Sequence, residues 1–459
     1  MNKDDKFARI AALRPSRNKE TPDPCVSGAP AEGDRLAQLL GARINRNHFG
    51  EHLSVKQWYA TPEMCAPDER SVSLLLPPSE NAGASAKVTA DPEHWLFLDT
   101  ETTGLAGGTG TYAFLIGIAW WDAGGLQTEQ FFMRDLDEEH SVLLELSERM
   151  VRRPVLFTFN GKSFDWPLLE TRYRMTRAIP AFTPKVHLDL LHPARQLWRL
   201  RLGTVRLKDL ERHVLAERSR SLDWSRDEDI DSSLIPQMYF DYLRGGPPEP
   251  IAGIFLHNQM DLRGLAALAG RIFALLGGEN RKTRDAIEVL GLSRLLRRKG
   301  QSDRAREHYE TALRYGLPRT LERLAQRELA QLAKREQDYA CANSLWDTLR
   351  QAPRSINRSE APLGAEDFQS SLETAIEAAK QLAIYYEHRA KKPQRALELV
   401  RGAASELREA QHSGKFARDR AAKIEMRLAR RLARLERRCV CAPLFGRSPA
   451  VHRRVNTIT

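Results

Sequence analysis

The sequence of 459 residues predicts an α/β domain with a mixed central sheet, followed by an all-helical domain of repeated helical hairpins. Two observations carry this prediction. Between residues 91 and 278, apolar runs of strand length come first and then alternate with segments of helical period, which is typical of a mixed sheet with helices on its faces. From Thr283 onward the periodicity is helical throughout, and one segment has the spacing of a tetratricopeptide repeat.

Length and composition are those of an ordinary water-soluble protein of two or three domains. The chain is 42% hydrophobic and 29% charged. No stretch approaches the roughly 20 apolar residues that span a bilayer, and the N-terminus (MNKDDKFARI) lacks the apolar core of a secretion signal. We therefore expect a cytoplasmic protein without a membrane partner. The five scattered cysteines favour neither a disulfide framework nor a zinc site.

Positive charge is concentrated in the C-terminal part of the chain. Residues 281–459 hold 38 of the 71 Lys and Arg and 22 of the 60 Asp and Glu, a net charge of +16. Residues 1–280 hold the remaining 33 basic and 38 acidic residues, a net charge of −5. This asymmetry indicates either polyanion binding or a solubilising helix surface.

The first ninety residues are expected to contribute little to the core. Residues 1–34 are rich in Pro, Ser, Gly and charge without periodicity, so we expect them to be disordered. A short N-terminal extension follows at 35–90. It contains a candidate amphipathic helix at 35–44, a candidate strand at 52–59 and a polar connector at 77–91.

The α/β domain is expected over residues 91–278. Short apolar runs bounded by turn residues predict its strands, and the spacing of apolar residues predicts its helices. The expected strands are 95–98, 111–121, 129–133, 155–159 and 186–191, and the expected helices are 138–152, 167–175, 204–215, 238–244 and 251–273.

The all-helical domain is expected over residues 283–438, with a tail at 439–459. Its best hairpin, 293–318, carries small residues and turn residues at the tetratricopeptide spacing: Gly300, Ala305, Tyr309, Ala312 and Pro318. Similar hairpins are expected at 321–349 and 372–400, and a plain helical bundle is the alternative. A last helix at 415–438 is apolar on one face and basic on the others, as in a solenoid cap that also contacts nucleic acid.

The first strand of the α/β domain runs directly into Asp99-Thr100-Glu101-Thr102. Because side chains alternate along a strand, Asp99 and Glu101 point the same way. Two carboxylates at the end of a buried strand repel each other and are costly to desolvate, and a divalent cation relieves both problems. The alternative is a polar strand end with a Thr-rich turn.

Further acidic groups occur at the ends of later elements. Asp165 lies five residues after Asn160, where a strand passes into a helix. Asp261 and His257 are four residues apart, so they share one face of the last helix of the domain. The sequence thus offers four carboxylates, Asp99, Glu101, Asp165 and Asp261, and one imidazole.

These residue types suit two Mg²⁺ or Mn²⁺ ions, which prefer oxygen ligands. Two such ions about 4 Å apart can activate a water and stabilise the leaving 3′ oxygen of a phosphodiester. Asp99 is suited to bridging both ions, Glu101 and Asp261 to binding the ion that orients the water, and Asp165 to completing the set.

Other residues near these carboxylates have candidate roles in the same chemistry. His257 could accept the proton of the water. Asn160 and the backbone from Thr100 to Thr102 could hold the terminal nucleotide, and Lys162 could contact a phosphate. Taken singly, each of these residues also has an ordinary structural role, such as a helix cap.

Six stretches together resemble a known family: LDTETTGL with FLIGIA, FTFNGKSFDWPLL, HLDLLHPAR, LKDLE and LHNQMDL. Residues 95–273 are similar to the DEDD exonuclease branch of the ribonuclease H-like superfamily, and more narrowly to the YprB-like family. The resemblance implies a ribonuclease H-like fold, dependence on two metal ions and 3′-to-5′ exonuclease activity on a single-stranded end of DNA or RNA. A helical-repeat tail, which could take a protein partner, is also typical of that family.

His257 differs in spacing from the better-known branches of the superfamily, and Asp189 has no known role in the motif. Those branches carry H-x-x-x-x-D or Y-x-x-x-D before the last aspartate, and His257 stands at the tyrosine spacing. Asp189, in HLDLL, has no assigned role, and we expect a structural aspartate at a strand end. Two alternative functions are a non-catalytic module that binds nucleic acid and recruits a protein, and an endonuclease.

Overall fold

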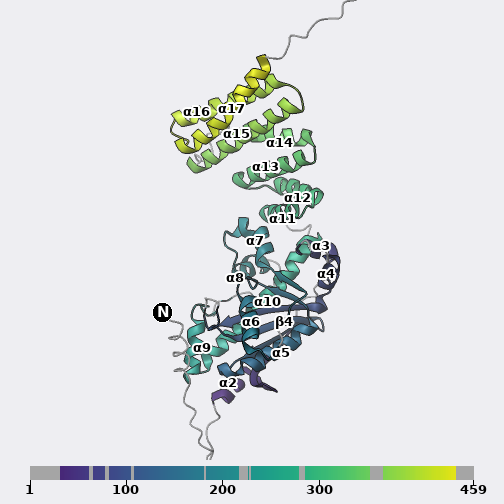
Figure 1. Ribbon diagram of the computed structural model, residues 1–459, viewed down its shortest axis with the longest axis vertical. Coiled ribbons are helices and arrows are strands. Elements are labelled where there is room, and N and C mark those ends of the chain that lie inside the picture. The colour runs from purple at the N-terminus through teal and green to yellow at the C-terminus, as the bar shows by residue number, and fades with distance from the viewer. Residues whose placement is uncertain are drawn as a thin grey trace, which may run out of the picture. The chain divides into compact units, whose positions relative to one another are not determined.

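The computed structural model describes residues 32–60, 66–77, 82–104, 108–179, 182–216, 226, 229–278, 285–351 and 365–440. Of the disorder expected at 1–34 and the tail expected at 439–459, residues 1–31 and 441–459 lie outside these ranges. Residues 32–34 and 439–440 are helical. The chain divides into two compact units, Met1–Gln301 and Ser302–Thr459 (Figure 1). None of the described helices is long and apolar enough to cross a membrane.

The first unit is built on one sheet of seven strands in the order β1-β2-β5-β4-β3-β6-β7. Its strands are β1 (Arg43–Asn47), β2 (Gly50–Ala60), β3 (Trp95–Thr102), β4 (Ala113–Asp122), β5 (Gly125–Phe132), β6 (Val155–Thr158) and β7 (Val186–Asp189). Strands β3, β6 and β7 are parallel, and the remaining pairs are antiparallel. The mixed sheet is therefore confirmed, and β1 and β2, from the expected N-terminal extension, pair with it through β5.

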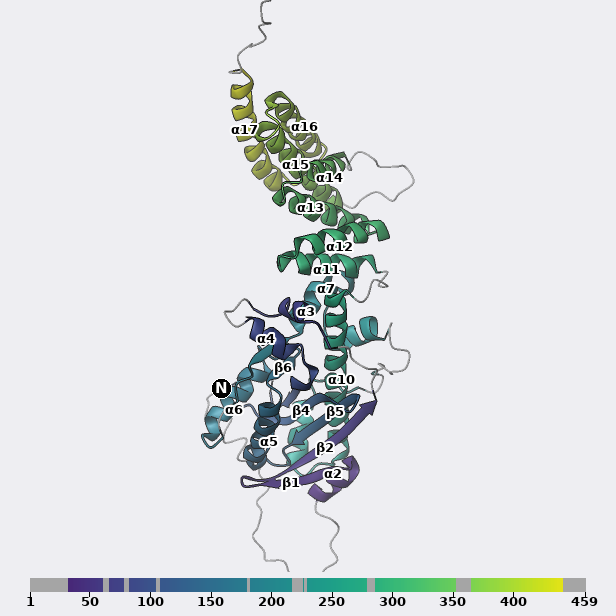
Figure 2. The ribbon, with the colours of Figure 1, turned by 90° about the vertical axis from the view of Figure 1, so that its right-hand side faces the viewer.

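Helices cover both faces of this sheet, with α5 on one side and α10 on the other (Figure 2). The α-helices of the first unit are α2 (Glu32–Leu40), α3 (Glu69–Ser73), α4 (Ala82–Thr89), α5 (Glu139–Arg152), α6 (Asp165–Thr176), α7 (Leu191–Leu202), α8 (Leu207–Leu210), α9 (Ile235–Leu243), α10 (Glu249–Gly277) and α11 (Ala286–Arg298). Two short 3₁₀ turns, η1 (Pro92–His94) and η2 (Leu136–Glu138), and a π-helical turn, η3 (Glu211–Leu215), complete the unit.

The N-terminal helices and α7 correct the expectations from the sequence. The helix expected at 35–44 ends at Leu40, and β1 begins at Arg43. The connector expected at 77–91 contains α4, and no helix was expected where α3 and α7 form. Helix α7 is stabilised by tertiary packing: Trp198 is buried, and its indole Nε1 donates to Glu288 of α11 at 3.0 Å. A Cβ atom on Gly291 of α11 would lie 2.1 Å from the carbonyl oxygen of Leu197, so the absence of a side chain there permits the close approach of α7 and α11.

Strand β3 sends alternate side chains to opposite helical layers. Trp95 and Phe97 face α10, and the Trp95 ring lies 5.3 Å from that of Phe273. Leu96 and Leu98 join the core that contains α5 and α6. The same alternation directs the residues at the end of β3 to α10 or to α6.

The second unit is entirely helical in its described residues. Its helices are α12 (Ser302–Tyr315), α13 (Arg319–Arg335), α14 (Tyr339–Gln351), α15 (Ala365–His388), α16 (Pro393–His412) and α17 (Arg418–Val440). The helix pairs α13–α14 and α15–α16 lie where hairpins were expected at 321–349 and 372–400, and α17 lies where the last helix was expected at 415–438. The assignment of these hairpins as tetratricopeptide repeats stays a prediction. Small side chains such as Ala330, Ala379 and Ala403 fill much of the core and allow the helices to pack closely.

A buried carboxylate fixes the last helix of this unit. Glu387 of α15 is 2% exposed. It accepts hydrogen bonds from Arg431, Arg434 and Arg438 of α17 at 3.1, 2.6 and 2.9 Å. Three arginines that would otherwise repel one another on the basic helix are thus held against the core by one charge.

We expect Glu387→Gln to destabilise the packing of α17 by about 1–3 kcal/mol, because the arginines lose a buried charged acceptor. Peptide-resolved hydrogen–deuterium exchange should show faster exchange in residues 365–440 and no change in α10. Glu398→Gln is the matched control, since its 63% exposed side chain pairs with Arg395 in solvent. Equal exchange in the two variants would contradict the role of Glu387.

Candidate active site

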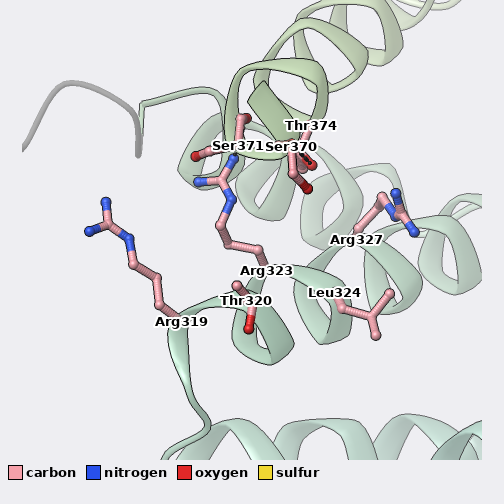
Figure 3. A pocket seen from close by; sticks show the side chains of 8 residues that line it. All are labelled: Arg319, Thr320, Arg323, Leu324, Arg327, Ser370, Ser371 and Thr374. Carbon is pink, nitrogen blue, oxygen red and sulfur yellow. Dashed lines mark hydrogen bonds between the residues drawn. The ribbon is translucent and has the colours of Figure 1, made fainter. Parts of the chain in front are cut away.

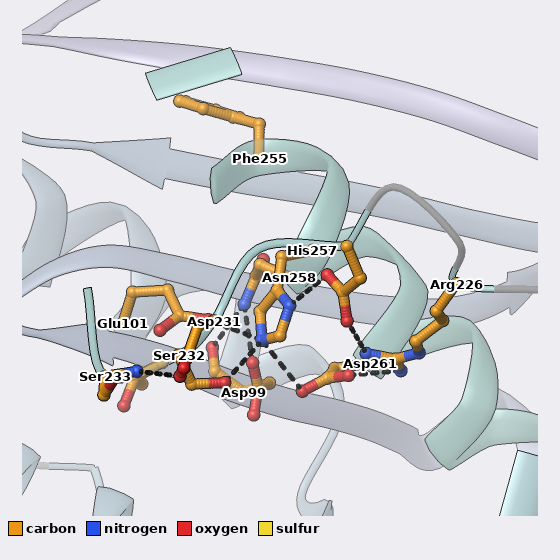
Figure 4. Close-up of polar contacts among 12 residues, drawn as sticks. Asp99, Glu101, Arg226, Asp231, Ser232, Ser233, Phe255, His257, Asn258 and Asp261 are labelled. Carbon is orange, nitrogen blue, oxygen red and sulfur yellow. Dashed lines mark hydrogen bonds and ion pairs between the residues drawn. The ribbon is translucent and has the colours of Figure 1, made fainter. Parts of the chain in front are cut away.

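The four carboxylates and the imidazole that the sequence singles out lie together at the carboxyl end of β3. Figure 4 shows Asp99, Glu101, His257 and Asp261 of this group. Asp99 and Glu101 are on β3, Asp165 begins α6, and His257 and Asp261 are on α10. The imidazole Nε2 of His257 is 3.9 Å from Glu101 Oε1 and 3.8 Å from Asp261 Oδ2. As expected from the sequence, Asp99 and Glu101 point the same way, and in the structure both face α10.

Burial raises the pKa of three of these carboxyl groups, and mutual repulsion adds to the effect for Asp99 and Glu101. For Asp99 the largest cause is burial, followed by the charges of Asp261, Glu101 and Asp165, and its pKa lies well above the usual range. Burial and the charges of Asp261 and Asp165 likewise raise the pKa of Glu101 well above its usual range. Burial also raises the pKa of Asp165. The cluster therefore favours a bound cation or protons over bare negative charge.

Asn258 of α10 anchors the carboxylate of Asp99. Its Nδ2 donates to Asp99 Oδ2 at 2.8 Å, and its Oδ1 accepts from Gln130 Nε2 at 2.8 Å. Gly117 of β4 pairs with Asp99 on one side and with Gln130 of β5 on the other. A Cβ atom on Gly117 would lie 2.0 Å from Asn258 Oδ1, so the glycine leaves the space that the amide occupies.

Further amides continue this network away from the cluster. Gln259 Nε2 donates to Gln130 Oε1 at 2.9 Å, and the hydroxyl of Tyr59 donates to Gln259 Oε1 at 3.0 Å. Gln130 is fully buried and Gln259 is nearly so. Because buried amides with satisfied partners have fixed orientations, the orientation of Asn258 toward Asp99 is fixed as well.

Asp229 orients the imidazole of His257. Its Oδ1 lies 2.6 Å from His257 Nδ1. Although burial alone would raise the pKa of Asp229, its hydrogen bonds and ion pairs with His257 and Arg226 lower the pKa below the usual range. An ionised carboxylate only accepts, so Nδ1 carries the proton and the lone pair of a neutral His257 is on Nε2, facing Glu101 and Asp261.

Arg226 lies beside Asp261 and pairs with three carboxylates. Its guanidinium donates to both oxygens of Glu211 at 2.6 and 2.7 Å, to Asp229 at 3.2 Å, and to Asp261. Among the residues that the structure describes, no three His, Cys, Asp or Glu side chains are arranged to hold one metal ion. The carboxylate of Asp261 is instead paired with the positive charge of Arg226.

Glu211 is itself unusual, because burial raises its pKa to about 7 despite the two hydrogen bonds from Arg226. It lies in the π-helical turn η3, within the LKDLE stretch. A Cβ atom on Gly264 of α10 would lie 1.9 Å from Glu211 Oε1, so the carboxylate packs directly on the α10 backbone. Glu211 therefore places Arg226 beside Asp261.

The candidate substrate residues on β3 form hydrogen bonds within the protein. The hydroxyl of Thr100, on the face of β3 opposite to Asp99, donates to Asp165 Oδ1 at 2.5 Å and ties the start of α6 to β3. The hydroxyl of Thr102 donates to the carbonyl oxygen of Gly104 at 3.0 Å. Strand β3 has an irregular register against β4 at Glu101–Thr102, a common device for directing side chains near functional sites.

Asp189 organises the loop that precedes α6. Its carboxylate accepts from the backbone N–H groups of Asn160 at 2.8 Å, Lys162 at 3.1 Å and Leu191 at 3.0 Å. The expected structural role of Asp189 is thereby confirmed. Asn160 has a φ of +68°, which an asparagine tolerates better than most residues. The substrate contacts of Thr100, Thr102, Asn160 and Lys162 remain predictions.

Several residues of the cluster were missed from the sequence. Asn258 carried a usable signal, since it lies three residues before Asp261 in LHNQMDL and so shares a helix face with it. Asp229 and Arg226 had no such sequence signal. The segment that contains them lacks periodicity, and only the folding of the chain brings these two residues to α10.

In metal-free protein, we expect Asp99→Asn to increase the free energy of unfolding by roughly 1–3 kcal/mol at pH 8. A carboxyl group whose pKa is raised by folding binds more protons in the folded state, so its ionisation destabilises the fold as the pH rises above the unfolded pKa near 4. The gain should shrink as the pH is lowered to 5. Thermal unfolding in the presence of a chelator at pH 8 and pH 5 measures the gain in stability. Asp122→Asn, at an exposed position, is the control. Destabilisation by Asp99→Asn at both pH values would contradict the raised pKa of Asp99.

Comparison with known proteins agrees with this architecture. The family described as the RNase_H superfamily (RNase_H_2) matches residues 96–273. The chain is also similar to the uncharacterized protein YprB of Bacillus subtilis (strain 168), with 28% identity over 312 residues, which covers 68% of this chain and 69% of that protein. The matched range begins in β3 and ends in α10, and so contains all five residues of the cluster. Residues 96–273 therefore form an RNase H-like domain.

Proposed function

We propose that this protein is a metal-dependent 3′-to-5′ exonuclease that hydrolyses single-stranded ends of DNA or RNA. The observation that carries the proposal is the convergence of Asp99, Glu101, Asp165 and Asp261 at the carboxyl end of β3, where their charges repel one another. The match of the domain to the RNase H superfamily supports a nuclease, and a cluster of this kind suits hydrolysis of a phosphodiester.

The oxygen-only set of carboxylates fits Mg²⁺ or Mn²⁺ by its chemistry. Asp99, Glu101, Asp165 and Asp261 would hold two such ions, which when bound lower the pKa of a water and neutralise charge on the phosphate. Arg226 has to release Asp261 before that carboxylate can serve as a ligand, and it retains Glu211 as a partner when it does so.

His257 is proposed to act as the general base. Because Asp229 holds the proton on Nδ1, the lone pair of Nε2 faces the carboxylates at the place where an attacking water would lie. Asp229 is a positioning residue: it fixes the ring and stabilises the imidazolium that forms when the proton is taken. The tyrosine spacing of His257 is compatible with this geometry.

Hydrolysis is tested with strands of DNA and RNA labelled at the 3′ end, in the presence of Mg²⁺ or Mn²⁺. Mononucleotide release should fall at least about a hundredfold in Asp99→Ala, because the ions supply several kcal/mol of transition-state stabilisation. Asp122→Ala is the matched control. Both ions should also raise the thermal unfolding midpoint of the wild type more than that of Asp99→Ala.

Three outcomes separate the proposal from its alternatives. Unchanged release by Asp99→Ala would overturn the assignment of the site. Strand binding without degradation would favour the non-catalytic binding module. Cleavage of a circular single strand would identify an endonuclease, since a circle has no 3′ end.

The His257–Asp229 pair is tested by its effect on kcat. We expect His257→Asn to lower kcat by about 10²–10⁴-fold and Asp229→Asn by about tenfold or more, with KM nearly unchanged. Asp231→Asn is the control, because this neighbouring carboxylate is exposed and accepts from the backbone of Ser233. Wild-type kcat in Asp229→Asn would exclude the positioning role.

A further inference from the structure

Arg226 joins a carboxylate of the candidate metal site to a carboxylate outside it. Its side chain is 10% exposed, and its guanidinium donates to Glu211, Asp229 and Asp261. Asp261 is one of the four candidate metal ligands, whereas Glu211 belongs to the π-helical turn η3. The contacts with Glu211 and Asp261 should therefore respond differently when a cation binds Asp261.

The pair of Arg226 with Glu211 fixes the plane of the guanidinium. Nε donates to Glu211 Oε2 at 2.6 Å and Nη2 donates to Oε1 at 2.7 Å, which is the two-bond geometry that arginine forms with a carboxylate. The Glu211 side chain is 1% exposed and packs on the backbone of α10 at Gly264. Because Glu211 is not a candidate ligand, this pair holds Arg226 in place whether or not Asp261 remains a partner.

The contact of Arg226 with Asp261 is exchangeable by comparison. Nη2 carries two N–H groups, and it donates both to Glu211 Oε1 and to Asp261 Oδ1. A divalent cation on Asp261 neutralises this carboxylate and repels the guanidinium. One N–H of Nη2 then loses its acceptor, and a mostly buried donor without an acceptor is costly. A new anionic acceptor beside Asp261 would remove this cost.

The exchange depends on the acceptor being a carboxylate. Figure 3 shows another mostly buried arginine, Arg323 of α13, reaching toward Ser371 of α15, whose backbone carbonyl oxygen accepts from its Nη2 at 2.9 Å. A backbone carbonyl carries no net charge, so Mg²⁺ competes for it less strongly than for a carboxylate. Asp261, by contrast, is an acceptor that Mg²⁺ or Mn²⁺ would take from Arg226.

We propose that Arg226 binds a phosphodiester oxygen of the nucleic acid strand through the Nη2 N–H that pairs with Asp261 in this structure. This inference rests on the proposed function, because it places the strand at the carboxylate cluster. Guanidinium groups form short charge-assisted hydrogen bonds with phosphate oxygens. A phosphate that shares a cation with Asp261 lies next to this carboxylate. The guanidinium therefore keeps its pair with Glu211 and exchanges one anionic oxygen for another.

In protein without metal, Asp261 and the strand compete for the same N–H group of Arg226. Removal of the Asp261 carboxylate should therefore release Arg226 to the strand even when no metal ion is present. Removal of any carboxylate from the cluster also lowers the general repulsion of the strand, so a second carboxylate is needed for comparison. Glu101 serves this purpose, since its ion pair in the same cluster is with His257.

The test is equilibrium binding of a 5′-labelled single-stranded DNA oligonucleotide in a chelator at constant ionic strength, measured by fluorescence anisotropy. We expect Asp261→Ala to tighten binding at least about fivefold more in the wild-type background than in the Arg226→Gln background, as gain of a charge-assisted hydrogen bond predicts. Glu101→Ala, the matched control, should tighten binding equally in both backgrounds.

A second probe identifies the phosphate oxygen. A neutral methylphosphonate at the 3′-terminal linkage should weaken binding to Asp261→Ala at least about fivefold more than the same group at the 5′-terminal linkage. This comparison needs no substitution at Arg226, so it applies even where Arg226→Gln does not fold. Equal tightening by Asp261→Ala in both backgrounds, equal weakening by the two methylphosphonates, or no strand binding would overturn the proposal.

Failure of this inference is distinguishable from failure of the proposed nuclease activity. The binding experiment contains no metal ion and measures no hydrolysis. The expected binding pattern without hydrolysis in Mg²⁺ or Mn²⁺ would exclude the nuclease and keep Arg226 as a contact of the strand. Hydrolysis without the binding pattern would exclude the role of Arg226 alone.

Discussion

Repulsion among four carboxylates is the constraint around which the first unit is arranged. Each surrounding element supplies a group that opposes this repulsion without removing it. Asn258 donates to Asp99, Thr100 donates to Asp165, and Arg226 pairs with Asp261. These contacts come from α10, β3 and the segment before α9, so the tertiary structure holds together charges that would separate in an open chain. The negative charge that these contacts leave uncompensated favours a bound cation.

Much of the fold could be predicted because the relevant signals are local. The apolar run at β3 followed by Asp99 and Glu101 contains both the strand and the direction of its carboxylates. Helix α7 could not be predicted, because its stability comes from packing against α11 through Trp198. Likewise, Asp229 reaches His257 from 28 residues away through a segment without period. Contacts of that kind depend on the fold and have no local sequence signal.

The helical unit uses its many arginines in two physically different ways. On α17, three arginines share one buried carboxylate, so their charge is satisfied within the protein. On α13, Arg323 is buried between backbone carbonyls and has no such partner among the described residues. The net positive charge of the C-terminal part is therefore not a uniform surface property. Its effect on partners depends on which cations are already neutralised.

Asp99, Gly117 and Gln130 are paired neighbours on the adjacent strands β3, β4 and β5. The amide of Asn258 occupies the space that a side chain at Gly117 would fill. The residue types at position 117 of β4 and position 258 of α10 therefore depend on each other. A chain with any side chain at the position of Gly117 has to give up the amide at 258, and a chain that keeps this amide is restricted to glycine on β4. Among related chains, joint retention or joint loss of this pair would reveal whether Asp99 is anchored in the same way, even where the carboxylates themselves are identical.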